Sequence, residues 1–261
     1  MKKLLCLLTI LLCLTGAARA ETLFAPESGD AFRTLCASGD TLWVRGSRET
    51  VYRFDAQTGE TALLTLPEEN EADESGLYHA WAGWFWHEGQ LCALRVATEP
   101  GAGVAEVALC RLKESDGLLV PESAAPLGSS AFAGWEAFSV EGSCVVGDTL
   151  CLNVYDGRSE VYLIPLNGSD VTATGLQDAR FCPYEDGLLC AIPDEAGGRG
   201  YTLLLVDTVT GGARRLASLD EGAFSGLAQE PGTNRLLFVR KGALWAFDPD
   251  AARSEQLAPL P

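Results

Sequence analysis

Ala80-Trp81-Ala82-Gly83-Trp84 is repeated almost letter for letter as Ala131-Phe132-Ala133-Gly134-Trp135. A looser copy follows as Ala223-Phe224-Ser225-Gly226-Leu227. When Asp30-Ala31-Phe32 and Asp178-Ala179-Arg180 are placed in the same register, the five alanines lie 49, 51, 48 and 44 residues apart. The chain therefore contains one structural unit repeated five times.

Each unit continues with the pattern of a β-hairpin and a third strand. Short apolar runs flank the turn pairs Gly39-Asp40, Glu88-Gly89, Gly147-Asp148, Asp186-Gly187 and Thr233-Asn234. Four short antiparallel strands recurring at this period are typical of β-propeller blades, whereas a β-sandwich gives no reason for a fivefold repeat. We predict an all-β propeller of about five four-stranded blades, over residues 30–67, 78–121, 130–176, 178–219 and 222–259.

The first residues have the pattern of a secretory signal peptide. A basic start at Lys2 and Lys3 is followed by an apolar run from Leu4 to Leu14 and by small residues up to Ala20. We therefore expect residues 1–20 to be cleaved and residues 21–261 to form the propeller. No later stretch has the roughly 20 apolar residues of a membrane helix. The expected location is secreted, either extracellular or at the cell envelope, without membrane insertion.

The charge of the chain excludes one class of partner. The formal net charge is −17, and loss of residues 1–20 would make it −20. Such a chain repels phosphate backbones, so we expect no nucleic-acid partner. Solubility outside the cell is the simplest reason for this acidity.

The repeats also resemble a known group of proteins. In two of the five units, the third strand runs into a turn of the form Asp-x-x-Thr-Gly. These turns are Asp55 to Gly59 and Asp207 to Gly211. This style of repeat resembles secreted bacterial propellers related to quinoprotein-type repeats, and the N-terminal propellers of exported Firmicutes proteins. The resemblance implies the fold, but the cofactor ligands of quinoproteins have no counterparts here, so we expect no cofactor.

Candidate binding residues come from propeller geometry. The first strand of each blade lines the central channel, and the face at which these strands begin is where propellers usually bind ligands. Acidic and aromatic side chains gathered there would suit a sugar or a positively charged peptide, while the alternative is that the acids cap turns and the aromatic rings pack between blades. The candidates are Asp30, His79, Trp81, Ser130, Phe132, Trp135, Asp178, Glu221 and Phe224.

The cysteines and histidines indicate neither catalysis nor a metal site. Residues 21–261 contain seven cysteines, and the hairpin register places Cys36 opposite Trp43, Phe85 opposite Cys92, Cys144 opposite Cys151 and Cys182 opposite Cys190. Because they share positions with aromatic residues, we interpret them as small buried apolar groups, with one or two cross-strand disulfides as the alternative. The two histidines, His79 and His87, are too few for a three-histidine site, so we expect no catalytic or metal residues.

Three functions agree with these observations. The leading hypothesis is an exported, non-enzymatic propeller that binds a carbohydrate, a peptide or a protein. The second is a propeller-fold glycan lyase or hydrolase, which would need two carboxylates in one channel, with Asp30, Asp178 and Glu221 as candidates. The third is a structural or sensing module of a longer exported solute-binding protein.

Overall fold

The structure is a computed structural model of the 261-residue chain. It describes residues 33–46, 50–66, 72–127, 132, 135, 138–155, 157–166, 170–194, 200–220 and 222–259, and of residues 33–35 it describes the backbone only. The expected signal peptide and the candidates Asp30, Ser130 and Glu221 lie outside these residues. Every regular element in the described part is a β-strand, and no helix there is long and apolar enough to cross a membrane.

The chain forms five blades of four antiparallel strands, as the repeat predicted. Blade 1 contains β1 (Arg33–Ser38), β2 (Thr41–Arg45), β3 (Thr50–Asp55) and β4 (Thr61–Thr65). Blade 2 contains β5 (Tyr78–His87), β6 (Gln90–Glu99), β7 (Gly103–Ser115) and β8 (Leu118–Pro126). Blade 3 contains β9 (Ser139–Val146), β10 (Thr149–Tyr155), β11 (Ser159–Pro165) and β12 (Thr172–Gln177). Blade 4 contains β13 (Arg180–Tyr184), β14 (Gly187–Pro193), β15 (Tyr201–Val206) and β16 (Ala213–Leu219). Blade 5 contains β17 (Ser225–Gln229), β18 (Leu236–Arg240), β19 (Ala243–Asp248) and β20 (Arg253–Pro259).

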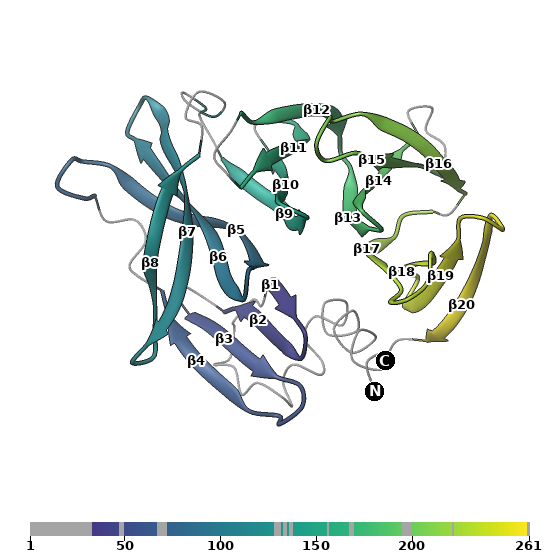
Figure 1. The fold of residues 1–261 in the computed structure, drawn as a ribbon, viewed down its shortest axis with the longest axis horizontal. Coiled ribbons are helices and arrows are strands. Elements are labelled where there is room, and N and C mark those ends of the chain that lie inside the picture. Colours follow the sequence, from purple (N-terminus) through teal and green to yellow (C-terminus); the bar gives the residue numbers. More distant parts are fainter. Residues whose placement is uncertain are drawn as a thin grey trace.

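The blades are arranged around a centre, with the first strand of each blade innermost (Figure 1). Consecutive first strands contact one another from β1 through β5, β9 and β13 to β17. We call the side at which these strands begin the upper face. The side with the turns after the first and third strands of each blade is the lower face.

Blades 1 and 2 are additionally joined at their outer edges. Strand β4 pairs in parallel with β8 at Thr65 and Leu118, so the two blades form one eight-stranded sheet. The Thr65 amide donates to the Gly117 carbonyl at 2.9 Å. The other three blades are separate four-stranded sheets.

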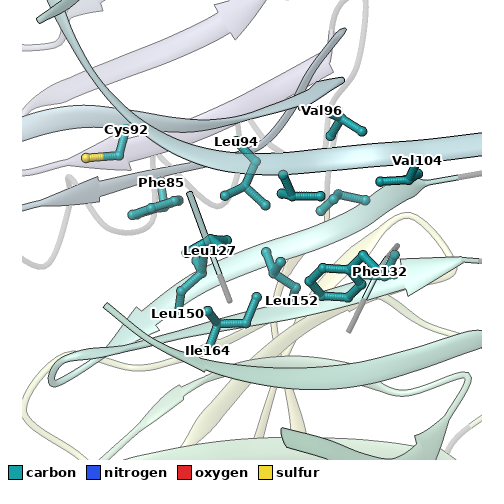
Figure 2. Packing of buried hydrophobic residues seen from close by; sticks show 13 residues of the cluster. Phe85, Cys92, Leu94, Val96, Val104, Leu127, Phe132, Leu150, Leu152 and Ile164 are labelled. Carbon is teal, nitrogen blue, oxygen red and sulfur yellow. The ribbon is translucent and has the colours of Figure 1, made fainter. Parts of the chain in front are cut away.

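The hydrophobic core lies between successive blades. Figure 2 shows the cluster between blades 2 and 3, where Phe85 and Leu94 face Leu150, Leu152 and Ile164. A similar cluster joins blades 4 and 5. Each blade thus buries its faces only because its neighbours are present, as expected for repeat architectures.

Three of the four predicted cysteine pairings are confirmed, and the fourth is wrong by one residue. Cys36 lies opposite Trp43, Phe85 opposite Cys92 and Cys144 opposite Cys151. In blade 4, however, Cys182 lies opposite Leu189, and Cys190 lies opposite Phe181.

The displaced turn of blade 4 explains this error. Tyr184 pairs with Gly187, so the turn is Glu185-Asp186 instead of Asp186-Gly187, and Glu185 adopts the positive φ of 51°. A shift of one residue moves every side chain of a strand to the other face. Gly187 is the first residue of β14, and a side chain there would clash, because a Cβ would lie 2.9 Å from the Val206 carbonyl oxygen.

One expectation about the last blade needs correction. Gln229 pairs with Leu236, so the expected Thr233-Asn234 turn lies within a longer connection.

The Asp-x-x-Thr-Gly segments form closed turns on the lower face. Oδ1 of Asp55 accepts the amides of Gln57 and Thr58 at 2.8 and 2.9 Å. Oδ1 of Asp207 accepts the amides of Val209 and Thr210 at 2.9 and 2.8 Å. These backbone hydrogen bonds stabilise the charged form and lower the pKa of both carboxyl groups.

Candidate functional site

Three of the predicted aromatic residues are buried between blades. Trp81 is 8 % exposed and packs between blades 1 and 2, Phe132 is 2 % exposed between blades 2 and 3, and Phe224 is 3 % exposed between blades 4 and 5. Figure 2 shows Phe132 beside Leu152. For these three rings the structure therefore shows the interblade packing that the sequence had left as the alternative.

His79 forms a hydrogen bond with a residue of the connection before its own blade. Its Nε2 lies 2.9 Å from Oδ2 of Asp73, and this hydrogen bond is the main reason why the pKa of Asp73 is lowered. Oδ1 of Asp73 accepts the amides of Ser75 and Leu77 at 2.8 and 3.1 Å. His79 thus holds a turn of the connection against the upper face.

Asp178 lies exposed at the start of blade 4. Its backbone has a positive φ of 53°, and its amide donates to the Ser159 carbonyl of blade 3 at 3.1 Å. The residue therefore links two blades through its backbone, while the residue itself is exposed.

A hollow of about 250 Å³ lies on the upper face, where the first strands β5 and β9 begin. Blades 1, 2 and 3 each contribute to it. We call it the channel-mouth hollow, and its principal side chains are Arg45, Trp81, Trp84, Phe138, Glu141 and Ser143. The Ser143 hydroxyl donates to the Trp84 carbonyl at 2.6 Å and fixes β9 against β5.

Glu141 is the carboxylate of this hollow, and buried polar side chains hold it in place. Its Oε2 lies 2.8 Å from the Ser159 hydroxyl and 3.5 Å from Nδ2 of Asn153. Asn153 and Ser159 are buried, and Nδ2 of Asn153 also donates to the Ala179 carbonyl of blade 4 at 3.1 Å. A carboxylate fixed by such a network is prepared for a ligand, because little side-chain entropy remains to be lost.

Sequence reasoning missed Glu141 and Arg45. Glu141 is the only charged residue of β9, a first strand, so its position in the repeat was a usable signal. Arg45 ends β2, and nothing in its sequence context distinguishes it from other surface arginines.

A second hollow on the upper face lies beside Trp135. It measures about 420 Å³ and is lined by Trp135, Gly157, Arg158, Glu160, Tyr162 and Gln177. The ring of Trp135 meets Phe132 and Tyr162 edge-on, with centroids 5.1 and 5.6 Å apart. The Trp135 carbonyl accepts the Val104 amide of blade 2 at 2.8 Å. The structure therefore places Trp81 and Trp135 in two different hollows.

All seven described cysteines are free thiols, and five of them are buried. Burial raises the pKa of Cys36 and Cys182 to about 12 and that of Cys92 to about 11. A hydrogen bond with Cys151, together with burial, raises the pKa of Cys144. Among the described residues there is no group of three or more His, Cys, Asp or Glu side chains that could hold a metal ion.

Comparison with known proteins finds likeness in structure alone. No protein-family model and no curated protein matches the sequence. An oligogalacturonate lyase in complex with manganese is similar with a TM-score of 0.56 and 14 % identity, over 89 % of this chain and 66 % of that one. An oligogalacturonate lyase from Vibrio parahaemolyticus gives 0.54 and 10 %, over 85 % and 63 %. A puromycin hydrolase mutant complexed with PGG gives 0.51 and 20 %, over 89 % and 40 %.

These similarities establish that the chain has a β-propeller fold. At 10 to 20 % identity they show the fold alone, and the chain spans less than two thirds of the length of the two lyases. Function has to be argued from the residues of the site.

Proposed function

We propose that this protein is an exported, non-enzymatic binding propeller that recognises a peptide segment of a partner protein at the channel-mouth hollow. The observation that carries the proposal is the carboxylate of Glu141, fixed by Ser159 and Asn153, in a hollow that Arg45 and Trp84 also line. One acid and one base beside aromatic rings fit a peptide that carries charges of both signs.

The burial of the aromatic rings favours a peptide over a carbohydrate at this place. A sugar needs an accessible ring face on which to stack. Trp81 and Trp84 line the hollow but are both buried, so they provide its floor and leave little open ring surface. Specific affinity would then come from Glu141 and Arg45.

Binding to a peptide array and a glycan array, with and without calcium, tests this function. We expect reproducible peptide ligands, and Glu141→Gln should weaken their binding about tenfold, because the hydrogen bond from a basic peptide group would no longer have a charged acceptor. Glu106→Gln is the matched control, since Glu106 is an exposed acid on β7. Peptide binding that Glu141→Gln leaves unchanged would contradict the site, and a folded protein without any peptide ligand would contradict the function.

The upper face as a whole is tested by a second variant. Trp135→Ala combined with Asp178→Ala removes candidates that lie outside the channel-mouth hollow. If this double variant abolishes binding while Glu141→Gln does not, the ligand occupies the second hollow instead.

A lyase activity is the second candidate, and the two lyases among the similar structures are the reason to test it. The net charge of −17 opposes the approach of an acidic oligosaccharide such as oligogalacturonate. Incubation with oligogalacturonate, followed by ultraviolet absorbance of unsaturated products, should show no turnover. Turnover that depends on Asp178 would favour the lyase.

A further inference from the structure

Two cysteines of blade 3 lie directly opposite each other on neighbouring antiparallel strands. Cys144 of β9 pairs with Cys151 of β10, across the turn Gly147-Asp148. Directly opposite residues of such a pair have Cα atoms about 4.5 or 5.5 Å apart, and their side chains leave the sheet on the same side. Disulfides join Cα atoms that are about 4.4 to 6.8 Å apart, so this register meets the backbone requirement for a bond.

The two thiol groups also contact each other. Cys151 belongs to the cluster of buried side chains between blades 3 and 4, and Cys144 packs against the same cluster. A hydrogen bond links the two thiols. Replacement of this contact by an S–S bond removes two hydrogen atoms and adds no volume. The closed cluster therefore has room for the bond, although its interior is tightly packed.

No other two cysteines among the described residues lie opposite each other. Cys182 and Cys190 of blade 4 are on adjacent strands, but they are one residue out of register. Side chains one position apart leave opposite faces of a sheet, so Cys182 packs towards blade 5 and Cys190 towards blade 3. The sheet of blade 2 separates Cys92 from Cys110 in the same way. Cys36 faces a tryptophan.

We propose that Cys144 and Cys151 are joined by a cross-strand disulfide when the protein folds under oxidising conditions. The oxidant is an external disulfide, such as oxidised glutathione. The thiolate of Cys144 attacks this disulfide and releases one thiol, and the thiolate of Cys151 then displaces the second thiol from the mixed disulfide. In total the two cysteines lose two protons and two electrons, and the external disulfide is reduced to two thiols.

Burial sets the order in which the two cysteines react. Cys144 is partly exposed, whereas Cys151 is completely buried, so an external disulfide meets Cys144 first. In the folded protein a hydrogen bond with Cys151, together with burial, raises the pKa of Cys144 and makes its reactive thiolate scarce. We therefore expect the bond to form while the chain folds, and only slowly once the blades have closed.

The bond would fix the two strands that support the channel-mouth hollow. Glu141 lies on β9 with Cys144, and Asn153 lies on β10 with Cys151. A covalent link between these strands keeps the Glu141 carboxylate near Nδ2 of Asn153, which is 3.5 Å away. This consequence rests on the function proposed for the hollow, whereas formation of the disulfide does not.

Refolding of the reduced, denatured full chain in a mixture of reduced and oxidised glutathione tests the proposal. The remaining thiols are blocked with N-ethylmaleimide, and the protein is digested with a protease that cleaves at Asp and Glu. Trypsin would leave both cysteines in one peptide, because no Lys or Arg lies between Lys113 and Arg158, whereas cleavage at Asp148 separates them. Mass spectrometry should find these two peptides linked, and separate after reduction.

The same digest compares the two cysteine pairs that look alike in sequence. The link between Cys144 and Cys151 should be at least about tenfold more abundant than a link between Cys182 and Cys190, because the second pair could bond only with strain. Cys190→Ala is the control that removes the neighbouring thiol of the cluster, and it should leave the first link unchanged. Cys144→Ala should abolish that link, and Cys151 should then be recovered with N-ethylmaleimide attached.

Three results would overturn the proposal. The first is a refolded protein that melts cooperatively but has both Cys144 and Cys151 blocked by N-ethylmaleimide. The second is a link between Cys182 and Cys190 that is as abundant as the proposed one. The third is a link involving Cys151 that persists in Cys144→Ala. Failure to find a peptide ligand on the array leaves all three readouts unaffected, so the disulfide and the proposed function are tested independently.

Discussion

The interface between blades 1 and 2 differs from the interface between blades 3 and 4 at one equivalent position. The second strand of blade 1 presents Trp43 to the next blade, and the second strand of blade 3 presents Cys151 at the corresponding place. Around Trp43 a groove of about 840 Å³ remains, whereas Cys151 and Cys190 are completely buried in a closed cluster.

The difference teaches that the repeat decides where a side chain points, and the size of that side chain decides how the blades meet. Small thiols let blades 3 and 4 pack closely, because protein interiors fill their volume at a fixed density. Between blades 1 and 2, two stacked indole rings lie beside a groove that stays open, although the outer edges of these blades are joined through β4 and β8. The following predictions, from the largest effect to the smallest, test this interpretation.

Placing the blade 1 residue in blade 3 should have the largest effect. Cys151→Trp forces a large ring into a closed cluster and should destabilise the protein by about 3 kcal/mol. Urea unfolding with an unchanged m-value measures this loss. Cys151→Ala is the control with no added volume, and a Cys151→Trp protein as stable as that control would refute the size argument.

Replacing Trp43 by a smaller residue at the groove should cost less. Trp43→Leu removes the stack with Trp86, but it enlarges a groove that is already open instead of creating a closed cavity. We therefore expect the free energy of unfolding to fall by about 2 kcal/mol. The same urea experiment applies. A loss greater than that of Cys151→Trp would mean that the groove is the more tightly packed interface.

The register that places Cys190 in the closed cluster depends on Gly187. Gly187→Ala puts a Cβ against the Val206 carbonyl and Leu205, and should cost about 1.5 kcal/mol. Gly147→Ala, at a turn with φ of 57° and open space, should cost about 1 kcal/mol from backbone strain alone. Thermal melts of the two variants provide the comparison. If Gly187→Ala is as stable as the unmodified protein, position 187 does not lie as close to the Val206 carbonyl as the structure shows.

The thiols of the two interfaces should differ in accessibility to alkylation. Cys36 is partly exposed, so we expect it to react before Cys151 and Cys190, which need blade separation. Because the pKa of Cys36 is raised to about 12, its thiolate fraction and rate should rise about tenfold per pH unit below that value. Mass spectrometry after timed iodoacetamide labelling measures the order, and earlier labelling of Cys190 would reverse the comparison.

The Asp-x-x-Thr-Gly turns of blades 1 and 4 should respond alike to pH. Their effect on stability should be the smallest of those predicted here. The folded pKa of Asp207 is lowered, so its contribution to stability is present above the unfolded pKa of about 3.9 and is lost as the pH falls through the folded value. Asp207→Ala should lower Tm slightly at neutral pH and have no effect well below the folded pKa. A difference in Tm that persists in strong acid would show that the carboxylate charge is not its cause.

The repeated motif was sufficient to predict the blades, but not the register of all of them. Gly39-Asp40, Glu88-Gly89 and Gly147-Asp148 are the turns that the pattern predicted, because each pairs its flanking residues without an extra residue. Asp186-Gly187 looks like the same kind of turn in sequence. Contact with β15 instead requires the glycine within the strand, and that contact comes from a distant part of the chain.

The candidate site was predictable only in part for the same reason. Trp81, Phe132 and Phe224 were found by their place in the repeat, but sequence could not tell a ring that packs between blades from one that faces a ligand. Whether Asp178 and Trp135 bind a ligand stays a prediction. The stack of Trp43 on Trp86 joins two blades, and the contact of Glu141 with Ser159 joins the first and third strands of blade 3, so neither lies within one local pattern.

The amino-acid sequence by itself determined the fivefold repeat, the four-stranded unit and most of the tight turns, because these depend on neighbours within about ten residues. Tertiary structure alone decided which neighbouring blades pack without a gap and which leave a groove between them. That outcome depends on the volumes of side chains brought together from two blades, and volume is matched across an interface only when the chain has folded.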